Sequence, residues 1–223
     1  MFDFKLIQPE KDIISSYIIP IRTNLLYTKA MEIAKGNIFE IRNEKHKAEI
    51  AELNRTLSTN LSGNSFDYII SLNVIEHIYN DYYFMEKILN LLMPNGKLII
   101  STKNKITSLT YPQNYASEYT PTELELLLNK YFSNIEAFGI FGNNKVMDYH
   151  EKEKEILQKI KKLDIIYNMP AGIFRIPYKI IRKNLLKEHA KLKQKIDKND
   201  YYFSKIKNNC DNCLDLFYIA YNL

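Results

Sequence analysis

The chain has 223 residues, of which 46% are hydrophobic and 26% charged, and its net charge is +5 at neutral pH. This length suits one domain with an elaboration, and the hydrophobic content excludes a disordered protein. No apolar stretch reaches the roughly 18 residues of a transmembrane helix, and the first residues lack a signal-peptide pattern, so we expect a cytoplasmic protein.

A strand–helix–strand unit is the first strong pattern. Residues 68–70 are apolar without alternation and follow the turn formers Asn64 and Ser65, which predicts a strand buried on both faces. Apolar positions at three- and four-residue spacing then predict a helix that Asp81 caps and that ends at the turn 94–96. Residues 97–101 predict a second buried strand, and such a unit implies a parallel pair with a right-handed crossover.

Polar residues follow both of these strands directly. Ligands of open α/β sheets bind outside the carboxyl ends of the strands, so we expect these residues at a binding site. The local pattern equally allows Glu76 and His77 to begin a solvated helix. The residues are Leu72, Asn73, Glu76 and His77 after the first strand, and Thr102, Lys103 and Asn104 after the second.

The C-terminal half continues the alternation of strands and helices. Thr120, Pro121 and Glu123 form a capping box with proline at the first helical position, which predicts a helix from residue 121. Residues 135–141 and 214–220 read as apolar strands. This order predicts an α/β fold with a doubly wound sheet.

The basic charge of the chain lies in residues 151–198. This segment has fourteen Lys and Arg against six Asp and Glu, a local charge of +8, and its apolar residues keep helical spacing. It reads as an amphipathic lid with solvated lysines, as a contact for an anionic substrate or nucleic acid, or as a surface for an anionic membrane. His46, His150 and His189 lie among charges and read as surface residues.

Residues 66–104, "FDYIISLNVIEHIYNDYYFMEKILNLLMPNGKLIISTKN", resemble the centre of class I S-adenosylmethionine (SAM)-dependent methyltransferases, especially the type 11 domain. Asn73 replaces the first Glu of the family's Glu-x-(Ile/Leu)-Glu-His pattern, Asn95 the first Gly, and Lys103 a Pro. The resemblance extends through the later segments of the chain and ends with the family's closing strand. The matching residues are Phe66, Asp67, Ile75, Glu76, His77, Leu92, Pro94, Gly96, Ser101, Thr102 and Asn104.

The resemblance implies a Rossmann-like sheet with a late antiparallel strand, SAM as cofactor, and methyl transfer to an oxygen or nitrogen of a small molecule or glycan. It divides the chain into a core (1–142), a basic helical insertion or lid (143–209) and a closing strand (210–223). The implied roles are catalysis for His77 and Glu76, cofactor binding for Ser71, Leu72, Asn73 and Asn43, and substrate binding for Thr102, Lys103 and Asn104.

Glu76 and His77 admit more than one role. His77 suits a general base, because an imidazole titrates near neutral pH. Some relatives hold a divalent cation with a Glu-x-x-Glu-His pattern, but here Asn73 is a weaker ligand than the carboxylate it replaces, and we predict no metal site. The third alternative is a packing role in the fold or a role in orienting the substrate.

The N-terminal part departs from the family. Such domains bind SAM over a glycine-rich turn after the first strand, yet the first glycine here is Gly36. Residues 16–24 resemble the second strand, with Arg22 and Asn24 where an acid is expected, and residues 24–36 resemble the helix that follows. Residues 37–43 resemble the third strand, with Asn43 at the position of an adenine-contacting Asp.

We therefore expect a core without the first strand and the glycine loop. A truncated reading frame, a decayed domain and an unusual cofactor site each explain this absence. If cofactor binding is lost, the alternative function is a non-catalytic methyltransferase-like subunit that contacts a partner, nucleic acid or an anionic membrane through residues 151–198.

Overall fold

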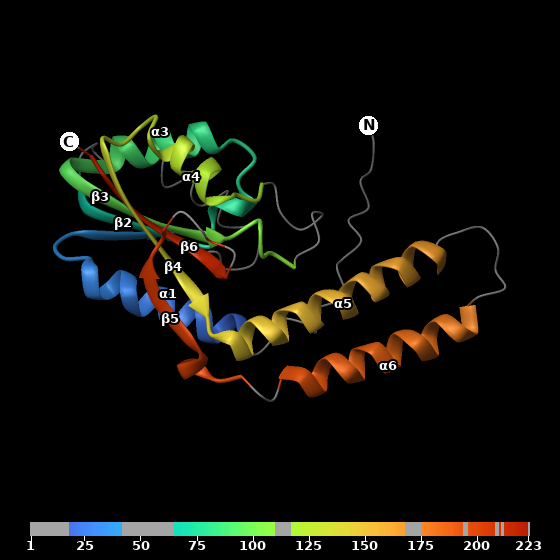
Figure 1. Ribbon diagram of the computed structural model, residues 1–223. Coiled ribbons are helices and arrows are strands. Elements are labelled where there is room, and N and C mark those ends of the chain that lie inside the picture. The colour runs from blue at the N-terminus through green and yellow to red at the C-terminus, as the bar shows by residue number, and fades with distance from the viewer. Residues whose placement is uncertain are drawn as a thin grey trace, which may run out of the picture.

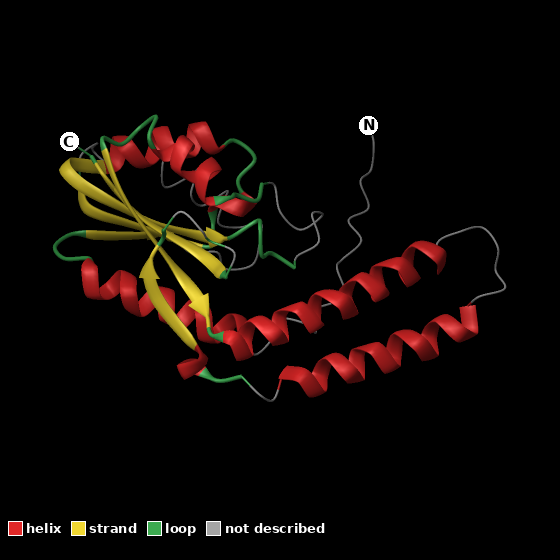
Figure 2. Cartoon of the chain, viewed as in Figure 1, coloured by secondary structure: helices red, strands yellow, loops and turns green. Residues whose placement is uncertain are grey.

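The computed structural model describes residues 18–41, 65–109, 117–167, 175–193, 196–207, 210 and 212–222 (Figures 1 and 2). None of the helices in these ranges is long and apolar enough to cross a membrane. The elements are α1 (Ile18–Ile33), β1 (Ile38–Ile41), β2 (Phe66–Leu72), the 3₁₀ turn η1 (Ile75–His77), α3 (Asp81–Leu91), β3 (Leu92–Lys103), α4 (Pro121–Leu128), β4 (Asn134–Gly142), α5 (Asn144–Tyr167), α6 (Arg175–Lys193), the 3₁₀ turn η4 (Lys198–Asp200), β5 (Tyr201–Lys205) and β6 (Cys213–Tyr221).

One mixed sheet with the strand order β1-β2-β3-β6-β4-β5 forms the centre of the fold. β1, β2 and β3 run parallel, whereas β6 is antiparallel to both β3 and β4, and β5 is antiparallel to β4. The predicted α/β class is therefore confirmed, and so is the late antiparallel strand. The last strand of the chain lies in the middle of the sheet.

Helices cover both faces of the sheet (Figures 1 and 2). On one face, α3 and α4 bury apolar stripes that include Phe84, Ile88 and Leu124. On the other face, α1 and the first turns of α5 bury residues such as Leu26 and Val146. The helix spacing predicted for α3 and α4 is confirmed, and Thr120 and Glu123 form the expected capping box. The N-cap of α3 is Asn80 rather than Asp81.

The N-terminal strand prediction is wrong. Residues 18–33 form one helix, so Arg22 and Asn24 lie on α1 and not at the end of a strand. The β-branched residues before Pro20 suggested a strand, but proline is tolerated in the first turn of a helix, and Leu26 and Ala30 pack on the sheet.

β1 is a strand as predicted, but its place in the sheet differs. Its residues pair in parallel directly with β2, from Ile38 opposite Tyr68 to Ile41 opposite Ser71. In the usual doubly wound order 3-2-1-4-5-6, the strand beside strand 4 is strand 1. Residues 38–41 therefore take the position of the first strand rather than the third.

The connection from β1 to β2 is short. Residues 42–65 are 24 residues, which is enough for one parallel crossover of a dozen residues or more. Strands 2 and 3 of the usual order would require further βαβ units of roughly 30 residues each. The connection also contains no glycine before Gly63.

The predicted basic insertion is a hairpin of two long helices. α5 and α6 lie side by side and extend away from the sheet as an arm (Figure 1). The helices end before β5, and β5 pairs with β4 as part of the sheet. The segment 143–209, expected to be a helical insertion, therefore also contains a strand of the core. Ile196, one of the apolar residues of segment 151–198 that were expected to keep helical spacing, lies beyond α6 and is buried in the core.

Asp200 stabilises the base of this arm, where the chain enters α5 and leaves α6. Its carboxylate forms an ion pair with Lys145 at 2.7 Å and accepts a hydrogen bond from the Asn143 side chain at 3.0 Å. The backbone N–H of Asn143 also donates to the Asp200 carbonyl. These contacts join the residues before α5 to those after α6. The Lys145 ammonium and the hydrogen bonds lower the pKa of Asp200 to about 2.

We expect Asp200→Asn to lower the melting temperature at pH 7, because the ion pair with Lys145 is lost. The folded-state pKa of Asp200 lies below its usual value of about 4. The contribution of Asp200 to the free energy of unfolding is therefore complete above pH 4 and disappears as the pH falls towards 2. Calorimetry between pH 2 and 7 measures this difference. Asp148→Asn, at an exposed position of α5, is the control, and an equal effect of both changes at pH 7 would contradict the assignment.

Candidate active site at the carboxyl edge of the sheet

Asn73 follows β2 and connects the carboxyl end of this strand to β3. This residue has a positive φ of 54°, a conformation that asparagine tolerates better than glutamate. Its backbone N–H donates to the Ser101 carbonyl at 3.0 Å. The chain leaves β2 by this turn and enters η1, so the Asn73 found in place of the family's Glu fits the backbone here.

Glu76 is buried at this edge, with only 2% of its surface exposed. Burial raises the pKa of Glu76 to about 7, while its own backbone N–H and the side chain of Thr102 act in the opposite direction. Lys103 also favours the ionised form. A carboxyl group with a pKa near neutrality can take up and release protons under physiological conditions, which suits general base catalysis.

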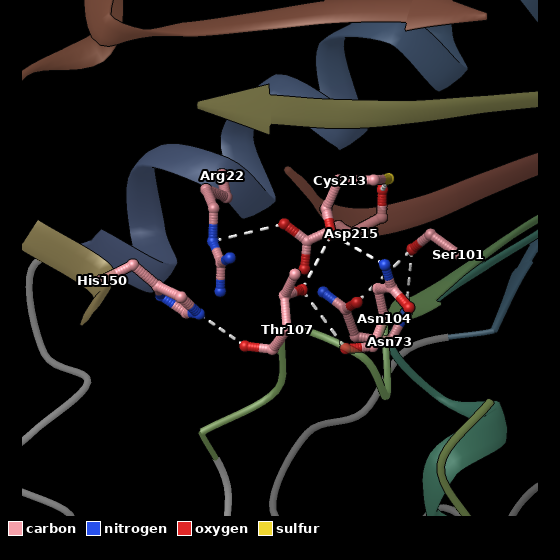
Figure 3. A network of polar contacts seen from close by, with 8 residues as sticks. All are labelled: Arg22, Asn73, Ser101, Asn104, Thr107, His150, Cys213 and Asp215. Carbon is pink, nitrogen blue, oxygen red and sulfur yellow. Dashed lines mark hydrogen bonds and ion pairs between the residues drawn. The ribbon is translucent and has the colours of Figure 1, made fainter. Parts of the chain in front are cut away.

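A second buried carboxyl group lies beside it. Asp215 on β6 is the direct cross-strand partner of Lys103 on β3, and 2% of its surface is exposed. Arg22 approaches from α1 and places Nε 3.2 Å from Oδ2 of Asp215 (Figure 3). Burial raises the pKa of Asp215, and Arg22 and Lys103 oppose this shift. Burial, together with Arg22, lowers the pKa of Lys103.

His150 joins the same edge from α5. Its Nε2 lies within hydrogen-bonding distance of the Thr107 carbonyl, and Thr107 in turn donates to the Cys213 carbonyl (Figure 3). The ring is partly buried, and burial lowers its pKa. The prediction that His150 is a surface residue is therefore wrong. His46 and the side chain of His189 lie outside the described residues.

The other predicted site residues occupy different environments. Ser71 is fully buried opposite Ile41, and its hydroxyl has no hydrogen-bond partner among the described residues. Leu72 is half-buried at the end of β2, and His77 is half-buried in η1. Glu76 therefore does not begin α3, because η1 separates it from that helix. Asn43 lies outside the described residues.

Asn104 has a role in the fold. It is fully buried, its side-chain amide donates to the Cys213 carbonyl at 2.8 Å, and its oxygen accepts from the backbone N–H of Ile106 at 3.1 Å. These bonds hold the residues after β3 against the start of β6. Within the described residues no three His, Cys, Asp or Glu side chains gather as metal ligands.

Sequence reasoning missed the roles of Arg22, Asp215 and His150. Asp215 gave a signal, since it is the only charged residue in the apolar stretch 213–221. Arg22 likewise interrupts an apolar stretch. His150 gave none, because its neighbours in the sequence are charged and its buried contact is with a distant segment.

Comparison with known proteins agrees with this architecture. Residues 20–100 match a family model described as "Methyltransferase domain". A search of curated proteins returns no match. A SAM-dependent methyltransferase of Thermotoga maritima, described as a possible histamine N-methyltransferase, is 10% identical with a TM-score of 0.50, over 89% of this chain and 87% of that one.

Two further solved structures are similar. One is a SAM-dependent methyltransferase of Archaeoglobus fulgidus, 12% identical with a TM-score of 0.44, covering 90% of this chain and 82% of that one. The other is phosphoethanolamine N-methyltransferase 2 of Haemonchus contortus, solved with SAM and 15% identical with a TM-score of 0.33. It is matched over 71% of this chain and 34% of its own length.

Residues 20–100 therefore resemble a methyltransferase domain in sequence, and the Thermotoga protein shares the fold of the chain. The matched residues include Glu76, whereas Thr102 and Lys103 lie just beyond them.

We expect Arg22→Met to destabilise the fold by about 3 kcal/mol, because the buried Asp215 loses its ionic partner. The double variant Arg22→Met/Asp215→Asn removes both charges and is expected to recover at least half of this loss. Urea unfolding of the wild type, both single variants and the double variant gives the coupling free energy. A double variant no more stable than Arg22→Met would show that Arg22 does not act through Asp215.

Proposed function

We propose that this chain is a SAM-dependent methyltransferase that transfers a methyl group to an oxygen or nitrogen atom of a small molecule or glycan. The observation that carries the proposal is the burial of Glu76 at the carboxyl edge of β2 and β3. Burying an ionisable carboxyl group is costly, and buried ionisable groups with shifted pKa values cluster at functional sites. A site that removes a proton from an acceptor needs such a group.

Glu76 is the general base in this proposal. Its carboxylate takes the proton from the acceptor's O–H or N–H group as that atom forms its bond to the methyl carbon. Lys103, whose ammonium favours the ionised form of Glu76, and the Thr102 hydroxyl lie beside it and orient the acceptor. His77, half-buried in the same turn, is the competing candidate for the base.

The residues present fit one side of a bound SAM molecule. The hydroxyl of the buried Ser71, which has no hydrogen-bond partner within the described parts of the chain, lies where β1 and β2 meet, and the end of β2 with Leu72 and Asn73 adjoins it. Ser71, Leu72 and Asn73 would therefore hold the cofactor, as the family resemblance implies. When bound, SAM supplies a methyl group on an activated sulfonium, so positioning accounts for most of the catalysis.

A non-catalytic methyltransferase-like subunit is the second candidate. It is favoured by the 24-residue connection from β1 to β2, which lacks glycine through residue 62. In this case the domain would keep its sheet as a scaffold for a partner. Cofactor binding separates the two candidates.

We expect the full chain to bind SAM in isothermal titration calorimetry and Ser71→Ala to weaken binding by roughly fivefold to tenfold, because one hydrogen bond to the cofactor is lost. The stability of Ser71→Ala is expected to be unchanged or higher, since an unsatisfied buried hydroxyl is removed. Ser133→Ala is the control at the opposite edge of the sheet, where Ser133 bonds to the Tyr221 carbonyl. If the full chain does not bind SAM, the second candidate, a non-catalytic methyltransferase-like subunit, is favoured.

Glu76→Gln is expected to reduce methyl transfer by roughly 100-fold or more while the fold is kept. The pKa of Glu76 in the folded protein, about 7, exceeds its unfolded value of about 4.3, so its contribution to stability is complete below pH 4 and is lost as the pH rises to 7. At pH 8 the variant is therefore expected to be more stable than the wild type, by up to about 3 kcal/mol.

Transfer of label from methyl-labelled SAM to fractionated small molecules and glycans measures the activity, and thermal unfolding at pH 4 and 8 measures the stability. The wild-type rate should rise with pH through about 7 as Glu76 ionises. His77→Ala is the comparison. If it abolishes transfer and Glu76→Gln does not, His77 is the base and the assignment to Glu76 is wrong.

A further inference from the structure

The basic charge of the arm is concentrated in one helix. α6 has seven Lys and Arg and one Glu within nineteen residues. α5 is nearly balanced, with six Lys against five Asp and Glu. The two helices therefore present different surfaces, although they lie side by side in the arm (Figure 1).

Three lysines among the described side chains of α6 form a row along the helix. Lys183, Lys187 and Lys191 are all exposed and lie four residues apart, so they share one side of the helix. Ile180 precedes Lys183 by three residues on the same side. It is 58% exposed, and its neighbour Ile181 is 44% exposed. Two large apolar side chains thus lie in water beside a row of positive charges.

The arm makes this surface accessible. The first turns of α5 pack on the sheet through Val146 and Tyr149, and beyond them both helices extend away from the core (Figure 1). α5 buries Ile156, Leu157 and Ile160 along its length, so the apolar side of α5 is already covered. Ile180 and Ile181 are the apolar side chains of α6 that the described contacts leave exposed.

We propose that the face of α6 formed by Ile180, Ile181, Lys183, Lys187 and Lys191 binds an anionic lipid bilayer. The ammonium groups are attracted to anionic headgroups, and the two isoleucines insert at the boundary of the acyl chains. Charge complementarity alone would also fit nucleic acid. The isoleucines favour the bilayer, because a branched apolar side chain gains by leaving water for acyl chains and has no such partner on a phosphodiester backbone.

Co-sedimentation with lipid vesicles tests the proposal on the full chain. We expect binding to phosphatidylcholine vesicles that contain about 30% phosphatidylserine, weak binding to phosphatidylcholine alone, and a steep loss as salt rises from about 50 to 500 mM. Lys183→Gln/Lys187→Gln/Lys191→Gln should weaken binding at least about tenfold. Ile180→Ser/Ile181→Ser should weaken it by a similar factor at unchanged charge.

The control removes the same charge from the other helix. Lys152, Lys154 and Lys159 are exposed on α5, and their change to Gln should alter binding less than threefold. Equal loss with both lysine triplets would mean non-specific attraction and would overturn the proposal. So would tight binding to a single-stranded RNA oligonucleotide that Ile180→Ser/Ile181→Ser leaves unchanged, because α6 would then be a nucleic-acid surface.

Discussion

The burial of β6 in the middle of the sheet is the constraint on which the rest of the structure depends. This strand bonds to β3 on one side and β4 on the other, so it joins the parallel part of the sheet to its antiparallel part. Its residues from Cys213 to Ala220 are all buried, and one of them is Asp215. A carboxyl group in that position needs a partner within reach, and α1 provides it through Arg22. The strand that completes the core thereby fixes the position of the first helix.

Local patterns predicted the elements whose apolar residues follow one period. β2, α4, β4 and β6 were all expected near their observed bounds, because strand runs and the Thr120 capping box depend on neighbouring residues only. β3 begins at Leu92, five residues before its predicted start, so the turn expected at 94–96 lies within the strand. The N-terminal part failed for the opposite reason. Residues 16–24 have strand-like composition, and their packing on the distant sheet decides in favour of a helix. The site shows the same division, since Glu76 was predicted from its place after β2, whereas the pairs Arg22–Asp215 and His150–Thr107 join segments far apart in the sequence.

The chain before β2 departs from the methyltransferase pattern more than the chain after it does. From β2 onward the strands and helices alternate as the resemblance predicts, and Glu76 is buried at the carboxyl edge, although Asn73 and Lys103 at this edge depart from the family pattern. Before β2, only α1 and β1 are described, and 24 residues lie between β1 and β2. Among the described residues, α1 and the end of β2 border the carboxyl edge on this side. Arg22 brings α1 to that edge, which makes the ion pair with Asp215 part of the site as well as of the fold.

The arm and the site share one helix. α5 begins at the sheet, where His150 contacts the Thr107 carbonyl, and the same helix continues outward to carry α6. Lys145 in the first turn of α5 is held by Asp200, so the direction of the arm is fixed relative to the carboxyl edge by contacts at both of its ends. A helix transmits such an orientation along its length because its hydrogen bonds are internal. A bilayer bound by α6, as proposed above, would therefore be held at a set position relative to Glu76.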